Sequence, residues 1–358
     1  MEQQFAGWRK KYFTIWTGQG ISTLTSSIVQ MAIIWYITGR TKSAAVLSFA
    51  TLAGFLPQAV LGMFIGVLID RHDRKKIMIC SDLVMSSACV ALAVSGIWGD
   101  IPIWMIFIVL FIRSIGNAFY APSLQAIMPS IIPKDQLTKY AGYSQSFESA
   151  SMIASPAIAA VLYSVFPLKV ILMLDVLGAI FAVATLTAVD IPAISREDKD
   201  KTNLLGEVKE GYGVMRSVPG MRELLVIGAL YAVIYFSIGT LYPLITMSYF
   251  NGGVRESGLV ETVFAVGTLV GSVSLGIWGG RIDKIKAIAG SIGIYGAGTL
   301  VTGLLPPDGF YVFVFLSFFM GVSVPFYFGV QTSMYRIKSH GEYLGRALSL
   351  SSSISMVA

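Results

Sequence analysis

Residues 62–76, GMFIGVLIDRHDRKK, join the end of one long apolar run to the start of the next through a short, strongly basic loop. The two runs cover about residues 44–69 and 77–98, and each is long enough to cross a bilayer, which needs roughly 20 mostly apolar residues. Gly62 and Gly66 lie one helical turn apart near the end of the first run, where small residues allow a neighbouring helix to approach closely. The stretch therefore predicts two membrane-spanning helices connected by a tight, charged loop.

The same pattern continues along the whole chain. Of its 358 residues, 55% are hydrophobic and 13% are charged, whereas soluble domains carry about 25% charged residues. We predict ten membrane spans and part of an eleventh, at about residues 12–38, 44–69, 77–98, 101–125, 140–166, 168–190, 222–250, 256–280, 286–305 and 309–335, with the last run starting near 342. The sequence ends inside that last run, so we expect it to be part of a longer chain.

The basic residues indicate the orientation in the membrane. If the N-terminus is cytoplasmic, 21 of the 26 Lys and Arg residues lie in cytoplasmic segments, which is the asymmetry that the positive-inside rule describes. We therefore expect a multi-pass protein of the cell membrane with a cytoplasmic N-terminus. The first apolar run is too long for a cleavable signal peptide and lacks a small-residue cleavage site, so it should remain as an anchor. The formal charge of +6 follows this topology and does not indicate nucleic-acid binding.

The charged loop occurs twice. Three of its residues recur at a constant offset of 210 positions, namely Gly66, Arg71 and Arg74 as Gly276, Arg281 and Lys284. An even number of spans precedes the second copy, which predicts two parallel repeats with the same topology and a site between them. We predict a six-helix bundle over 1–190, a cytoplasmic linker with an amphipathic helix over 191–221, and an incomplete second bundle over 222–358.

A glycine, then the Asp70-Arg71 pair, then a basic cluster resembles the cytoplasmic loop signature of the major facilitator superfamily. The resemblance implies an all-α polytopic membrane protein with two pseudo-symmetric six-helix bundles, of which the second is incomplete here. It also implies that the loops latch the two halves in the outward-facing state, through Gly62, Gly66, Asp70, Arg71, Arg74, Lys75, Gly276 and Arg281. Asp73 replaces a family glycine, so the turn is expected to be looser. The alternative is that the basic cluster only sets topology.

Arg113 is the one basic residue deep inside a predicted span. A charge there costs at least about 2.5–3.5 kcal/mol on insertion scales, so it needs a partner or a cavity. The helical rise places Arg113 and Glu148 at similar depths, and we expect them to pair. The stretch that begins at Arg113 also resembles the family's fourth-helix signature, which is linked there to proton coupling. The alternative is a purely structural ion pair.

Further ionisable residues lie in the predicted spans. We take Arg113, Glu148 and Asp175 as candidates for proton coupling, although Asp82, Asp175 and Glu261 could each lie close to a helix end and be solvated. Cys80 and Cys89 lie on one predicted helix about half a turn out of phase and cannot form a disulfide with each other, so we interpret both as packing thiols.

A polar stripe among apolar residues is expected to face a central cavity rather than lipid. Such a stripe runs along the first predicted helix, and aromatic residues occur on the seventh and tenth. The candidate cavity residues are Gln19, Ser26, Gln30, Asn117, Tyr235 and Tyr327. A pocket of this kind suits hydrophobic and cationic compounds through stacking and cation–π contacts. For any single aromatic residue, the alternative is packing against lipid.

The motifs of enzymes are missing from the sequence. His72 and His340 have no metal-ligand spacing, and no Gly-x-x-x-x-Gly-Lys-Ser/Thr phosphate loop is present. The chain instead resembles the bacterial drug and proton antiporters, a group that includes macrolide efflux proteins, in the Trp16-x-Gly18-Gln19 opening and the Asp70 loop. That resemblance implies proton-driven export of a hydrophobic drug such as a macrolide, with no cofactor beyond the proton gradient. The alternatives are an exporter of a siderophore or lysophospholipid, or an uptake symporter. We expect membrane lipid, protons and substrate as partners, no nucleic acid, and a monomer.

Overall fold

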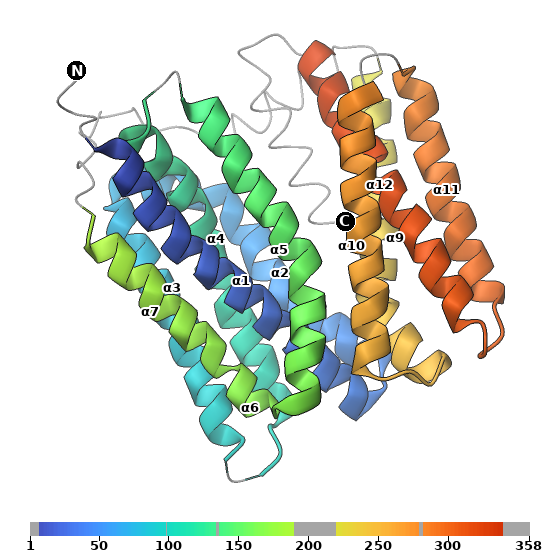
Figure 1. The fold of residues 1–358 in the computed structure, drawn as a ribbon, viewed down its shortest axis with the longest axis horizontal. Helices are drawn as coiled ribbons and strands as arrows, with labels where there is room; N and C mark the ends of the chain where they lie inside the picture. Colours follow the sequence, from blue (N-terminus) through green and yellow to red (C-terminus); the bar gives the residue numbers. More distant parts are fainter. Residues whose placement is uncertain (1–6, 98, 134–135, 190–219, 279–281, 339–358) are drawn as a thin grey trace. The chain divides into compact units, whose positions relative to one another are not determined.

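A computed structural model describes residues 7–97, 99–133, 136–189, 220–278 and 282–338, which form helices joined by short turns, with no strand among them (Figure 1). The chain divides into two compact units, Met1–Asp198 and Lys199–Ala358. The predicted amphipathic helix of the linker lies almost entirely outside the described residues.

The helices of each unit follow one another along the chain. Those of the first unit are α1 (Trp8–Thr41), α2 (Ala44–Arg71), α3 (Arg74–Ser95), α4 (Ile103–Ile131), α5 (Leu137–Val165), the short α6 (Leu168–Ile171) and α7 (Met173–Thr187). Those of the second are α9 (Met221–Leu244) with the π-helical turn η2 (Ile245–Tyr249), α10 (Val254–Trp278), α11 (Lys284–Leu304) and α12 (Phe310–Lys338). All ten complete spans predicted from the sequence are therefore helical, with α6 and α7 together making the sixth.

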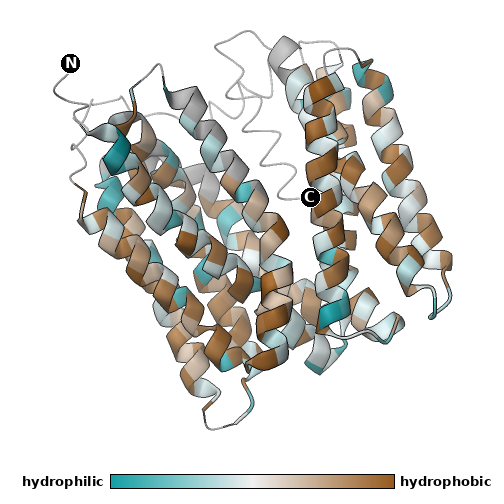
Figure 2. Ribbon diagram, viewed as in Figure 1, coloured by the Kyte–Doolittle hydropathy of each residue, from teal (hydrophilic) through white to brown (hydrophobic). Residues whose placement is uncertain are grey.

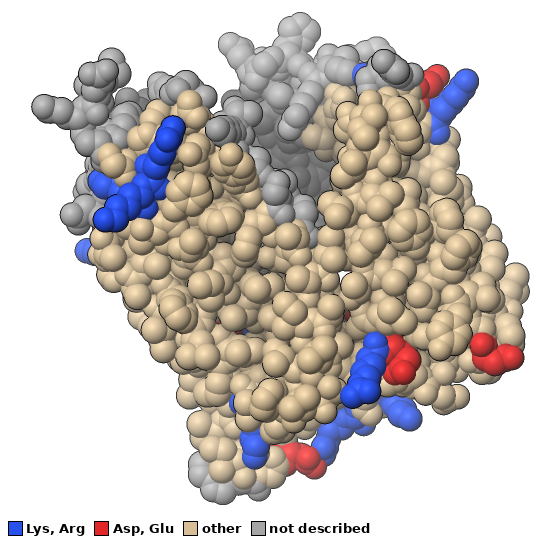
Figure 3. Space-filling model, in the orientation of Figure 1, with Lys and Arg blue, Asp and Glu red and all other residues tan. Residues whose placement is uncertain are grey.

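Nine helical segments of the described chain are long and apolar enough to cross a membrane. The fifth predicted span is the exception, because α5 begins with polar residues and is apolar only over Ala150–Val165. Hydrophobic residues predominate along the helices (Figure 2). The visible Lys, Arg, Asp and Glu side chains lie towards helix ends, and the uncharged surface lies between them (Figure 3). This distribution suits an apolar bilayer core with polar layers on both sides.

The first unit is built around close contact of α7 with α1 and α3, while α4 packs on α2 and α3. Small residues bring α1 and α7 together. A Cβ atom at Gly178 would lie 3.0 Å from Cα of Ser22 and would overlap the side chain of Thr25. Because Asp175 precedes Gly178 by three residues, this contact brings the carboxylate of Asp175 next to α1.

The second unit has an aromatic core and a close crossing of α10 and α12. Tyr231 and Tyr327 stack with their ring centroids 3.8 Å apart, and Tyr295 meets Tyr231 edge-on at 5.6 Å. At the crossing, a Cβ atom at Gly321 would overlap the backbone carbonyl of Phe264. Glycine is therefore required where these two backbones meet.

The structure bears out the internal repeat and adds a residue to it. The starts of α2 and α10, and those of α3 and α11, are 210 positions apart. Asp73 caps α3 by accepting hydrogen bonds from the backbone N–H groups of Lys75 (2.9 Å) and Lys76 (3.3 Å). Asp283, at the same offset, caps α11 in the same way, from Ile285 (2.9 Å) and Lys286 (3.2 Å). Asp73 thus starts a helix, where the sequence indicated only a looser turn.

Removing either cap is expected to weaken its unit. Asp73→Ala and Asp283→Ala each leave two N–H groups of the first helical turn without their acceptor, which costs about 1 kcal/mol. Thermal unfolding of the purified variants in detergent measures the loss. Asp73→Asn and Asp283→Asn are the matched controls, since asparagine caps helices about as well. Equal unfolding temperatures for the Ala and Asn variants would show that the caps contribute nothing.

An exposed ion pair joins the end of α1 to the turn before α4. Arg40 Nη2 lies 2.5 Å from Asp100 Oδ2, and this contact lowers the pKa of the Asp100 carboxyl. Because the pKa is lowered in the folded state, the stabilisation is present at neutral pH and disappears as the pH falls through that lowered pKa. Exposed pairs of this kind contribute little.

Candidate transport cavity and its ion-pair network

A cavity of about 880 Å³ opens inside the first unit, between α1, α2, α3, α4 and α5. It contains the predicted polar face of α1, with Gln19, Ser26 and Gln30 among its lining residues. Asn117 and Arg113 line it from α4, and Glu148 lines it from α5. The structure therefore brings together six of the predicted cavity and coupling residues around one space.

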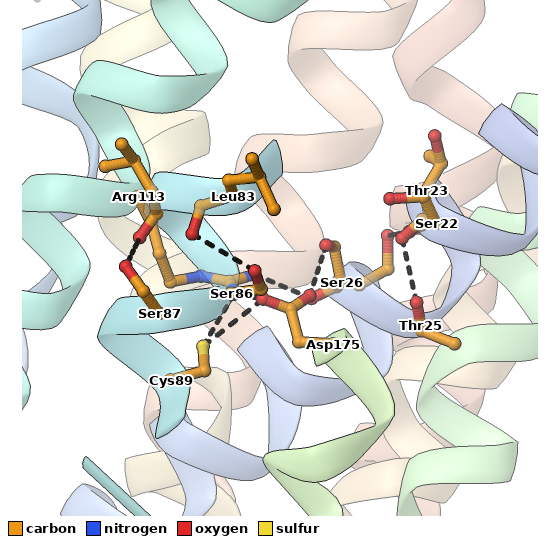
Figure 4. A network of polar contacts seen from close by, with 12 residues as sticks. Ser22, Thr23, Thr25, Ser26, Leu83, Ser86, Ser87, Cys89, Arg113 and Asp175 are labelled. Carbon is orange, nitrogen blue, oxygen red and sulfur yellow. Dashed lines mark hydrogen bonds and ion pairs between the residues drawn. The ribbon is translucent and has the colours of Figure 1, made fainter. Parts of the chain in front are cut away.

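A buried ion pair lies beside the cavity, at the centre of a network of polar contacts (Figure 4). The guanidinium of Arg113 on α4 binds the carboxylate of Asp175 on α7 through Nη1 and Oδ2. Both side chains are 4% exposed. Their mutual attraction offsets the cost of removing each charge from water, and that compensation is lost when either partner is removed.

Two further side chains complete the network. Ser26 Oγ on α1 donates to Asp175 Oδ1 over 2.5 Å, and Cys89 Sγ on α3 donates to Asp175 Oδ2 over 3.2 Å. Arg113 also donates to Cys89 Sγ (3.1 Å) and to the backbone carbonyl of Ser26 (3.2 Å). Four helices thus meet at one carboxylate, so a change in its charge alters a contact made by each of them.

This network corrects three expectations. Arg113 pairs with Asp175, not with Glu148, which is exposed and lines the cavity. Asp175 does lie in the first turn of α7, but it is buried rather than solvated, and Asp82 is likewise only 2% exposed. Cys89 takes part in polar contacts and is more than a packing thiol. Helical rise specifies only the position of a residue along its helix, whereas the rotation of each helix and the position of α7 against α1 and α3 decide which groups meet.

The predicted latch is only partly described. The surroundings of Gly62, Gly66, Asp70, Arg71 and Arg281 lie outside the part of the chain that the structure describes. Gly276 is exposed on α10, with room for a larger side chain, and Arg74 begins α3. Lys75 Nζ donates to the backbone carbonyls of Val189 (2.9 Å) and Thr187 (3.5 Å). Within its own unit, Lys75 therefore stabilises the carboxyl end of α7, where a positive charge is favourable.

The two predicted cavity tyrosines of the second unit belong to its core. Tyr327 has no exposed surface and stacks on Tyr231. Tyr235 is partly buried against the same cluster, with its ring 5.8 Å from that of Tyr295. The expectation that Tyr327 faces a cavity is therefore not met in this structure. The aromatic pattern on these helices is explained by packing between them.

Comparison with known proteins agrees with this architecture. A family model described as Major Facilitator Superfamily matches residues 15–358. The chain belongs to the major facilitator superfamily. Its fold resembles that of a bacterial homologue of the human lysosomal transporter Spinster, captured in an inward-facing and unoccupied conformation, with a TM-score of 0.74 and 14% identity over 98% of this chain and 80% of that one.

Relatives within the superfamily are much more similar in sequence. Macrolide efflux protein A of Streptococcus pyogenes is 48% identical over 357 residues, which cover 99% of this chain and 88% of that protein. Macrolide efflux protein A of Enterococcus faecalis is 48% identical over 317 residues, which cover 88% of this chain and 98% of that protein. As a major facilitator protein, the chain is a multi-pass membrane transporter rather than an enzyme.

Proposed function

We propose that the protein exports macrolides and related lipophilic drugs in exchange for protons. The observation that carries this proposal is the 48% identity to macrolide efflux proteins over nearly the whole chain. The cavity of the first unit supports it, because a volume of about 880 Å³ with polar and aromatic walls suits a large, mostly apolar ligand. The proposal takes the N-terminus as cytoplasmic and the working unit as a monomer.

The Arg113–Asp175 pair is the coupling element of this proposal. A proton on Asp175 would remove the counter-charge of a buried guanidinium, leaving Arg113 with Cys89 and a carbonyl as its remaining contacts. An unpaired buried charge is strongly unfavourable, so protonation would favour a different packing of α7 against α1, α3 and α4. Glu148 lines the same cavity and is the second acid through which a proton could enter.

The proton gradient has enough free energy for this role. One elementary charge crossing 100 mV releases about 2.3 kcal/mol, and each pH unit adds about 1.4 kcal/mol. In the proposal, that free energy offsets the cost of leaving the guanidinium of Arg113 without a counter-charge. It thereby drives the return of the transporter to its starting conformation after the drug leaves. The charged loops at Asp70 and Arg281 would latch the two halves on the cytoplasmic side between these steps.

Transport in proteoliposomes tests the proposal. Vesicles containing the purified protein are loaded with radiolabelled erythromycin, and an inward proton gradient is imposed. We expect protein-dependent loss of the drug that stops when a protonophore collapses the gradient. Protein-free vesicles correct for the passive redistribution of a weak base across a pH difference. Drug loss no faster than in these vesicles would contradict the proposal and point to a metabolite or lipid as substrate.

A further inference from the structure

A second polar layer lies in the first unit, two helical turns from the Arg113 network. Each of the four helices that meet at the network contributes a residue seven positions away: Gln19 before Ser26 on α1, Asp82 before Cys89 on α3, Tyr120 after Arg113 on α4, and Ala182 after Asp175 on α7. Seven residues correspond to about 10 Å along a helix and return to nearly the same face. Neighbouring helices run in opposite directions, so these four residues form one layer.

Contacts within the described residues confirm that this second layer is assembled. The hydroxyl of Tyr120 donates to Oε1 of Gln19, and Nε2 of Gln19 donates to the carbonyl of Ala182 over 3.5 Å. Asp82 lies close enough to Tyr120 and Asp175 for electrostatic interaction. Tyr120, Gln19 and Asp82 all line the cavity.

The Arg113 network and the second layer differ in their charge balance. In the network, the carboxylate of Asp175 is matched by the guanidinium of Arg113. In the second layer, Oδ2 of Asp82 accepts no hydrogen bond from the described residues, although the side chain is buried. Asp82 interacts electrostatically with an acid of the network, Asp175, and with a phenol of its own layer, Tyr120. A buried carboxylate oxygen without a hydrogen bond is costly, so Oδ2 of Asp82 calls for a donor that the described residues do not supply, either a proton or a cationic group in the cavity.

We propose that Asp82 is the anionic contact for a protonated amine of the transported drug. This inference rests on the proposed export function and specifies the substrate class, namely lipophilic amines. The amine would donate to the unpaired Oδ2 of Asp82, and the ring of Tyr120 would add a cation–π contact. When the cavity is empty, a proton would satisfy the same oxygen.

The surroundings favour an amine over a metal ion. The described residues contain no group of three or more His, Cys, Asp and Glu side chains that would hold a metal, whereas metal sites in proteins usually take several such ligands. The aromatic residues Trp16, Tyr120 and Phe147 line the same cavity as Asp82. A buried carboxylate beside aromatic side chains suits an organic cation, whose hydrophobic part occupies the rest of the space.

Equilibrium binding to the protein in lipid nanodiscs, without any gradient, tests this assignment. The two ligands are erythromycin, whose tertiary amine is protonated at neutral pH, and its N-oxide, which has nearly the same shape and no net charge. Asp82→Asn is expected to lower the affinity for the amine by about tenfold or more, which corresponds to the loss of one charge-assisted hydrogen bond. The affinity for the N-oxide is expected to fall by less than about twofold. Asp82→Glu keeps the charge and is expected to retain most of the affinity for the amine.

Asn117→Ala is the matched control, because Asn117 lines the same cavity without a charge. It is expected to affect the two ligands equally. Equal weakening of both ligands by Asp82→Asn would overturn the assignment and give Asp82 a structural role, and so would unchanged binding of both. If the wild-type protein transports erythromycin but Asp82→Asn binds it normally, only this inference fails. If the wild-type protein binds neither ligand, the macrolide function fails with it.

Discussion

Asp175→Asn is expected to abolish gradient-driven export and to destabilise the first unit by about 3–5 kcal/mol, the usual cost of removing one partner of a buried ion pair. The neutral amide still fills the site, so no cavity is created. It leaves the guanidinium of Arg113, which is buried, without a counter-charge. Arg113→Met should have a similar effect, because it leaves the Asp175 carboxylate buried and unpaired.

The double variant separates structure from coupling. Arg113→Met combined with Asp175→Asn removes both charges, and replacing a buried pair by uncharged residues is often neutral for stability. We therefore expect the double variant to regain the wild-type unfolding temperature in detergent but not proton-driven transport of erythromycin. The control is Glu148→Gln, whose exposed side chain should change the stability by no more than about 0.5 kcal/mol.

Two results would contradict this interpretation. Proton-driven export by the stable double variant would show that the pair is only structural and that coupling depends on another acid. An unchanged unfolding temperature for Asp175→Asn alone would mean that the buried contact contributes little to the fold. In the first case, Glu148 and Asp82 are the acids of the cavity that remain to be tested.

Gly321→Val is expected to prevent stable folding of the second unit. A Cβ atom there would overlap the backbone carbonyl of Phe264. On the facing helix α10, Cβ atoms at Gly267 and Gly271 would likewise overlap the backbone carbonyls of Phe318 and Val322 on α12. Overpacking against side chains usually costs about 1–3 kcal/mol. Backbone cannot adopt another rotamer, so α10 and α12 must separate, and the loss is expected at the upper end of that range or beyond it.

Gly293→Ala is the matched control for this crossing. Gly293 is exposed on α11, and no atom lies within 4 Å of the position that a Cβ atom would take there. Alanine there should leave stability unchanged or raise it by up to about 1 kcal/mol, because it restricts the unfolded chain. Yield of monodisperse protein and thermal unfolding in detergent compare the two variants. Normal yield and stability for Gly321→Val would mean that the α10–α12 crossing is looser than described.

The sequence by itself determined the features that depend on local composition. Nine of the ten predicted spans follow from apolar runs of sufficient length, because a bilayer leaves few alternatives to a helix for such a run, and α5 is the exception. The repeat is visible in residues 62–76 and their copy 210 positions later, and the polar face of α1 follows from helical periodicity. Run length, repeat and periodicity are all properties of the sequence read along the chain, so predicting them requires no knowledge of which helices are neighbours.

Only the tertiary structure decided which polar groups meet. Helical rise predicts that Glu148 pairs with Arg113, but the small-residue contact between α1 and α7 brings Asp175 to Arg113 instead. The same packing draws Cys89 into the network and leaves Asp82 buried without a partner for Oδ2 among the residues that the structure describes. Ion pairing depends on the rotation of each helix and on distances of a few ångströms between helices, and hydropathy and spacing specify neither of these.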